Sequence, residues 1–183
     1  MIRISVILAV VLAALSAPVY AASRGGIELP LQQDGLKLQG AGLLKKGFVF
    51  RVYLGALYLE ESGDADRVLS NVPKRIDIYY FRHIPREYML RAAHDALKKN
   101  LGDKKYAELL PGIEQIHEVF RDGEKGARAS ILYRPGEGLT YFYNDEPLIT
   151  VAGDDLANAY FGVWLGEHAG SKTVKKAMLG HDG

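Results

Sequence analysis

The chain has 183 residues, with 23 lysines and arginines, 22 aspartates and glutamates, and no cysteine. This near balance of charge produces no large field that would attract a polyanion, so no nucleic-acid partner is expected. The lack of cysteine excludes disulfides, thiolate catalysis and cysteine-ligated metals.

Residues 1–21 have the pattern of a secretory signal peptide. Arg3 precedes the apolar run ISVILAVVLAALSA, and Pro18 precedes the cleavage-site pattern Val19-Tyr20-Ala21. A membrane anchor needs roughly 18 to 20 apolar residues, and the run before Pro18 is shorter. We therefore expect export to the periplasm, no membrane insertion after processing, and a monomeric mature chain that forms one domain over residues 22–183.

The first part of the mature chain is predicted to form strands. After a loose leader AASRGG, two alternating runs, GIELPLQ and GLKLQGAG, are each bounded by glycine. A longer strand follows in GAGLLKKGFVFRVYLGALYLEE, residues 40–61, because apolar residues alternate there with period two. One face of this strand is predicted to be core and consists of Phe48, Phe50, Val52, Leu54, Ala56 and Tyr58. Arg51 and Tyr53 would share the other face.

The rest of the chain alternates between groups of strands and groups of helices. Helical spacing runs from Pro85 to Phe120, and Pro111-Gly112 is expected to kink or split this helix. The other predicted elements are a short helix in DADRVLSN, strands in RIDIYYF, ARASILYR, GLTYFYN and EPLITVAG, and two last helices, DDLANAYFGVWLG with an aspartate cap and SKTVKKAMLG with Ser171 as cap. This order predicts an α+β fold with a mainly antiparallel sheet whose helices cover one face.

Four phrases, in this order, are similar to a known family: the block at residues 40–61, IPREYML, PGEGLTYFYNDEPL and GVWLGEHAGSKTVKKAMLG. Over residues 27–180 the chain resembles the exported bacterial branch of the chalcone isomerase-like proteins. The resemblance implies an open-faced β-sandwich, in which helices cover one face of a large antiparallel sheet. It also implies a ligand cleft between the sheet and the helices.

The resemblance argues against the ring closure that the plant enzymes of this family catalyse. Their arginine falls here on Leu44 or, with a shifted gap, on Lys45, and their strand threonine falls on Tyr53. Their helix tyrosine falls on Tyr88 and their asparagine on Asp95. The guanidinium is thus lost or displaced, and a carboxylate at Asp95 would repel the developing anion. No catalytic residue is assigned.

The non-catalytic plastid relatives bind fatty acids through a guanidinium and a tyrosine hydroxyl. By this resemblance Arg51 and Tyr53 would receive a ligand carboxylate, and Tyr88 and Asp95 complete the candidate ligand-binding set. The alternative for Arg51 is a structural ion pair with Asp77. We therefore expect a non-catalytic protein that binds a small amphipathic or acyl ligand such as a fatty acid. The alternatives are an intramolecular lyase acting on a periplasmic substrate and an envelope protein that binds a partner without a ligand.

No metal or cofactor site is predicted. The histidines show no HxxxH pair and no nearby carboxylate pattern. His94 lies on an apolar helical face, which is more typical of a core histidine than of a ligand or a base. Gly40-Ala41-Gly42 is followed by a strand, so this GxG cannot cradle a dinucleotide phosphate at a helix N-terminus.

Overall fold

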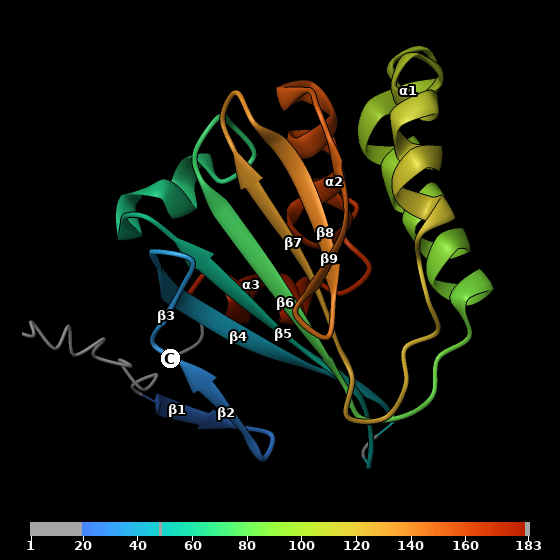
Figure 1. The fold of residues 1–183 in the computed structure, drawn as a ribbon. Helices are drawn as coiled ribbons and strands as arrows, with labels where there is room; N and C mark the ends of the chain where they lie inside the picture. The colour runs from blue at the N-terminus through green and yellow to red at the C-terminus, as the bar shows by residue number, and fades with distance from the viewer. Residues whose placement is uncertain (1–19, 48, 182–183) are drawn as a thin grey trace, which may run out of the picture.

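The computed structural model describes residues 20–47 and 49–181. In these ranges, seven strands that follow one another along the chain form one sheet, in which each strand is antiparallel to the next (Figure 1). The seven strands of this sheet are β3 (Gln32–Gln33), β4 (Leu36–Lys46), β5 (Phe50–Leu59), β6 (Lys74–Tyr80), β7 (Arg128–Arg134), β8 (Gly138–Tyr143) and β9 (Glu146–Val151). The edges of the sheet are therefore β3 and β9. The turn between β8 and β9 uses Asn144 and Asp145, both with positive φ, as in the tight hairpin turns that match strand twist.

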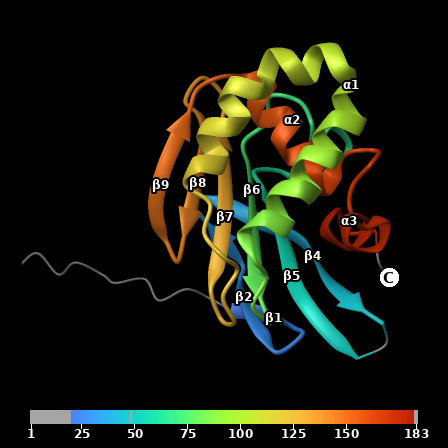
Figure 2. The same ribbon diagram turned by 90° about the vertical axis from the view of Figure 1, so that its right-hand side faces the viewer.

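Helices cover one face of the sheet, as Figure 2 shows. They are α1 (Arg86–Glu118), α2 (Asp154–Leu165) and α3 (Lys172–Met178), and the short 3-10 helix η1 (Ser62–Arg67) connects β5 to β6. The predicted α+β class, with an antiparallel sheet covered by helices on one face, is confirmed. Ser171 caps α3 as expected, since its side chain accepts a hydrogen bond from the Val174 amide. The aspartate cap expected for α2 is wrong, because its N-cap is Gly153.

The first helix folds back on itself at Gly102. This residue has φ 72° and ψ 165°, which only glycine adopts without strain. The expectation that Pro111-Gly112 would split the helix is wrong, because the helix continues through Pro111. The two parts, residues 86–101 and 103–118, are called here the first and second halves of α1. They lie side by side, and His94 in the first half contacts Tyr106 and His117 in the second.

Two glycines of β4 allow α3 to pack directly against the sheet. A Cβ atom on Gly42 would lie 2.6 Å from the Val174 carbonyl oxygen, and one on Gly40 would overlap the Ala177 carbonyl oxygen. The GxG pattern at residues 40–42 is thus explained by a close approach of helix backbone to strand backbone.

Both faces of the central strands are buried. Leu57, Ile76 and Ile131 belong to a core between the sheet and the helices. Leu54 and Tyr58 belong to a second core, on the face opposite the helices. The burial predicted for Leu54, Ala56 and Tyr58 is therefore confirmed.

The second core is covered by a hairpin of β1 (Tyr20–Arg24) and β2 (Ile27–Pro30), which contributes the fully buried Leu29. The loose leader expected at residues 21–26 is wrong, because Ala22, Ser23 and Arg24 pair with β2. Residues 1–19 of the expected signal peptide lie outside the described residues. Within the described part of the chain, no helix is both long and apolar enough to span a membrane.

A β-bulge at Val52 changes which way β5 side chains point. Leu44 pairs with Tyr53 and Lys45 pairs with Arg51, so Val52 is an extra residue on β5. Tyr53 consequently packs against the helix-side core, whereas Arg51 reaches the turn of the β1–β2 hairpin. The expectation that Arg51 and Tyr53 share one face is wrong. The expected burial of Phe50 is also wrong, since this residue is 62% exposed, and Phe48 lies outside the described residues.

Candidate functional site

A cavity of about 310 Å³ lies between the sheet and the helices. This volume is at the lower end of the range of roughly 300 to 1,000 Å³ that is typical of small-molecule sites. The floor is formed by apolar side chains of the sheet, including Leu44, Ile78 and Ile131. The first half of α1 contributes three alanines, Ala92, Ala93 and Ala96, whose short side chains leave the space unfilled. The cavity thus exists because small residues face the sheet where a helix usually carries larger ones.

Neutral hydroxyl groups are the most frequent polar groups of the lining side chains, and Trp164 adds an indole N–H. Among the described residues that line the cavity, none is charged, and four of the tyrosines are Tyr53, Tyr80, Tyr141 and Tyr160. Burial raises the pKa of Tyr53 to about 12 and raises that of Tyr160 well above its usual value. The phenols therefore stay protonated at neutral pH and can donate hydrogen bonds, but they are poor bases.

Tyr160 is a lining tyrosine whose buried hydroxyl is unsatisfied among the described residues. The residue is fully buried, and its hydroxyl has no hydrogen-bond partner among the described residues. A buried hydroxyl without a partner costs about 1 to 3 kcal/mol, so this tyrosine is kept for its ring packing at a cost in stability. By contrast, the Tyr80 hydroxyl already lies 3.3 Å from the Met89 sulfur.

The cavity opens to solvent between the start of α1 and the segment before α3. Tyr88, at this rim, is 59% exposed, and Ala92 and Gly170 are exposed beside it. One helical turn from Tyr88, the guanidinium of Arg91 lies 4.5 Å from the centroid of the Tyr88 ring. A cation is therefore held next to the opening, although it is not part of the apolar wall.

Of the four predicted ligand-binding residues, the structure places two at the cavity. Tyr53 lines its sheet side and Tyr88 its rim, whereas Arg51 and Asp95 do not line it. Arg51 donates a hydrogen bond to the Gly25 carbonyl oxygen and lies 4.4 Å from the centroid of the Phe81 ring. Asp95 is exposed on α1. Arg51 and Tyr53 thus cannot receive one carboxylate together, and ligand contact by Tyr53 and Tyr88 stays a prediction.

The alternative role of Arg51 as a partner of Asp77 is wrong as well. Asp77 is fully buried and accepts a hydrogen bond of 2.6 Å from Arg75 Nε. Arg128 Nη1 lies 3.5 Å from its other carboxylate oxygen. Arg75 and Asp77 are two residues apart on β6, so their side chains lie on the same face. This spacing is the sequence signal from which the pair could have been predicted.

Leu44 and Lys45 are the two positions where the resemblance can place the arginine of the ring-closing enzymes. The Leu44 side chain lines the cavity, and the neighbouring Lys45 is exposed at the end of β4. If the arginine falls on Leu44, an apolar group of the cavity wall stands in its place, and if it falls on Lys45, the cation there does not line the cavity. Such a site binds apolar surface and provides no fixed cation for an oxyanion.

The sequence comparison agrees with this architecture. The family model described as chalcone isomerase-like matches residues 26–180. The chain belongs to the chalcone isomerase-like family. The comparison with curated proteins found no match to this chain.

One solved structure similar to this chalcone isomerase-like chain is a fatty-acid binding protein from Arabidopsis thaliana. The TM-score is 0.67 and the sequence identity is 16%, over 84% of this chain and 92% of the plant protein. At this identity the likeness establishes a shared fold.

Proposed function

We propose that this chalcone isomerase-like protein binds one small amphipathic ligand, such as a fatty acid, without changing it chemically. The observation that carries this proposal is the cavity, open at one rim, whose lining is mainly apolar and carries no charged side chain among the described residues. Each methylene group moved from water into such a cavity contributes about 0.8 kcal/mol, so an acyl chain of several carbons supplies useful affinity. The shared fold of a plant fatty-acid binding protein supports the same ligand class.

The polar end of the ligand is proposed to lie at the rim. A carboxylate buried in an apolar wall without a cation is strongly disfavoured. Arg91 and the exposed Tyr88 lie side by side at the opening, so the guanidinium and the phenol can receive a carboxylate there. In this proposal Arg91 contacts the ligand carboxylate, which the sequence analysis expected of Arg51.

The proposal includes export to the periplasm by the signal peptide expected at residues 1–21. Cleavage after Ala21 would remove Tyr20, which pairs with Pro30, and would leave Ala22, Ser23 and Arg24 paired with β2. The N-terminal sequence of protein released by osmotic shock tests this, because a chain that still begins at Met1 would contradict it.

The cavity is tested by blocking its opening. Ala92→Trp places a large ring at an exposed position of the rim, so we expect at least about a tenfold loss of affinity for a fluorescent long-chain fatty acid. Ala107→Trp is the matched control, since Ala107 is exposed on the second half of α1 and does not line the cavity. Fluorescence titration measures both. Equal affinity of the two variants, or no saturable binding by the unmodified protein, would overturn the proposed function.

The head-group contact is tested by a pair of arginine variants. Arg91→Ala should weaken fatty-acid binding by about tenfold, the scale of one hydrogen bond to a charged group, and should not affect the corresponding fatty alcohol. Arg51→Ala is the control and should leave both affinities unchanged, because Arg51 contacts the β1–β2 hairpin. If Arg51→Ala weakens binding and Arg91→Ala does not, the carboxylate does not bind at Arg91 and this part of the proposal is wrong.

A further inference from the structure

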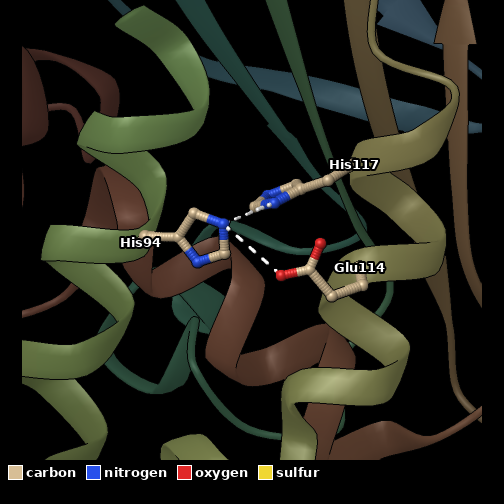
Figure 3. Close-up of side chains that lie close together, drawn as sticks. All are labelled: His94, Glu114 and His117. Carbon is tan, nitrogen blue, oxygen red and sulfur yellow. Dashed lines mark hydrogen bonds and ion pairs between the residues drawn. The ribbon is translucent and has the colours of Figure 1, made fainter. Parts of the chain in front are cut away.

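Outside the cavity, three side chains with metal-binding atoms converge where the two halves of α1 lie side by side. Figure 3 shows His94 on the first half pointing toward Glu114 and His117 on the second half. The His94 Nε2 atom is 3.2 Å from His117 Nδ1 and 3.7 Å from Glu114 Oε1. One ligand atom from each residue lies within 4.8 Å of the other two.

These distances fit the geometry of a zinc site. Zinc bonds to histidine nitrogen and carboxylate oxygen measure about 2.0 to 2.2 Å, so the ligand atoms of a tetrahedral centre lie roughly 3.3 to 3.6 Å apart. Two imidazoles and one carboxylate form a donor set that binds zinc with one coordination position left open. Glu114 and His117 are three residues apart and therefore lie on the same side of the second half of α1.

The surroundings of His94 support the same assignment. Its other ring nitrogen, Nδ1, lies 2.6 Å from the Tyr106 hydroxyl oxygen. A histidine that binds a metal through Nε2 carries its proton on Nδ1 and usually donates it to an oxygen nearby, which fixes the ring. Tyr106 supplies such an oxygen.

The burial and the charge of these three side chains are compatible with a bound metal ion. The His117 side chain is 1% exposed, whereas those of His94 and Glu114 are 30% and 53% exposed, so the cluster is closed inside and open to solvent outside. The Glu114 carboxylate offsets part of the charge of a divalent ion. The nearby Arg86 guanidinium is turned to the His117 carbonyl oxygen, to which it donates a hydrogen bond of 2.5 Å.

We propose that His94, Glu114 and His117 bind one divalent transition-metal ion such as Zn²⁺, with water in the remaining position. The ion joins the two halves of α1 across the break at Gly102. The first half carries Met89, Ala93 and Ala96 of the cavity wall, so metal binding stiffens the wall that faces the ligand.

The test uses the mature protein without a polyhistidine tag, stripped of metal by a chelator. We expect calorimetric titration to show one Zn²⁺ per chain and a raised melting temperature that the chelator reverses. With Co²⁺ as a probe, the visible absorption of a tetrahedral centre should appear. His94→Gln and Glu114→Gln each remove one donor from a partly exposed position, so both variants should fold and bind Zn²⁺ at least about tenfold more weakly.

Two further variants separate this site from other histidines. Tyr106→Phe keeps the ring but removes the oxygen near His94, and loss of such an outer contact should weaken Zn²⁺ binding by about 10- to 100-fold. His83→Gln is the matched control, because the exposed His83 belongs to a separate group with Asp122 and Glu124, and its loss should not affect the affinity. The proposal is overturned if the unmodified protein binds no stoichiometric Zn²⁺. It is equally overturned if His94→Gln binds as tightly as the unmodified protein, or if His83→Gln alone loses the ion.

Discussion

Asp77→Ala is expected to destabilise the protein by about 3 to 5 kcal/mol, the range for removing one partner of a buried ion pair. Asp77 is fully buried and the Arg75 side chain is 2% exposed. Without Asp77, Arg75 would keep only its 2.6 Å pair with the partly exposed Asp34, because its Nη2 atom already has no hydrogen-bond partner among the described residues. Urea denaturation measures the loss, which is a large share of the roughly 5 to 15 kcal/mol that stabilises a typical domain.

A matched aspartate provides the control for this prediction. Asp103 pairs with Lys98 on the surface, where its side chain is 87% exposed, so Asp103→Ala should cost less than about 1 kcal/mol. Arg75→Met combined with Asp77→Ala should recover part of the loss, because no unpaired charge then remains buried. Similar losses from the two aspartate variants would show that the buried pair is not what stabilises the sheet.

Gly42→Ala is expected to destabilise the protein by about 1 to 3 kcal/mol or more, as overpacking does. The new Cβ would lie 2.6 Å from the Val174 carbonyl oxygen and 2.8 Å from its Cα. Helix backbone cannot yield as a side chain can, so α3 must move away from β4. Thermal unfolding should show the change, since about 2 to 4 °C is expected per kcal/mol for a chain of this size. Val174 also lines the cavity, so the affinity for an acyl ligand should fall together with the stability.

The cross-strand partner of Gly42 is the matched control. Gly55 pairs with Gly42 in the sheet, and a Cβ on Gly55 would first meet the Met178 sulfur at 3.1 Å. Methionine is flexible and can repack, so Gly55→Ala should cost less than about 1 kcal/mol. If Gly55→Ala costs as much as Gly42→Ala, the close contact with α3 is not the reason for the glycine at position 42.

Much of the fold could be predicted because local patterns and tertiary structure agree. Strand periodicity located β6, β7, β8 and β9 within one or two residues, and helical spacing located α2 and α3. The break at Gly102 was missed because glycine inside a helical pattern is often tolerated, whereas proline is a stronger signal. Tertiary packing decided between Gly102 and Pro111.

The site was predicted less well because one extra residue in β5 changes the face to which the preceding side chains point. Strict alternation places Arg51 with Tyr53, but the bulge at Val52 turns Arg51 toward the β1–β2 hairpin. A bulge depends on pairing with the neighbouring strand, so period two in a single sequence does not reveal it. Tyr53 and Tyr88 were found at the cavity because the family resemblance fixed their positions.

The histidine cluster could not be predicted from spacing along one helix. His94 meets Glu114 and His117 only because the helix reverses between them. Glu114 and His117 are three residues apart in the sequence, and this Glu-x-x-His spacing is the signal that could have led to the site. The spacing alone does not show that His94 is the third residue of the site, because that depends on the fold-back of the helix at Gly102.

An open sheet has two edges, and both are poor templates for adding another strand. The edge strand β3 has only two residues, so it presents few free backbone groups to a second chain. At the other edge, β9 carries Pro147, which lacks an amide hydrogen, opposite a register shift in β8. Two copies of the protein that meet at β3 or at β9 therefore find only a short or interrupted ladder to continue. The fold can keep its apolar interior open to a ligand and still resist aggregation through its sheet.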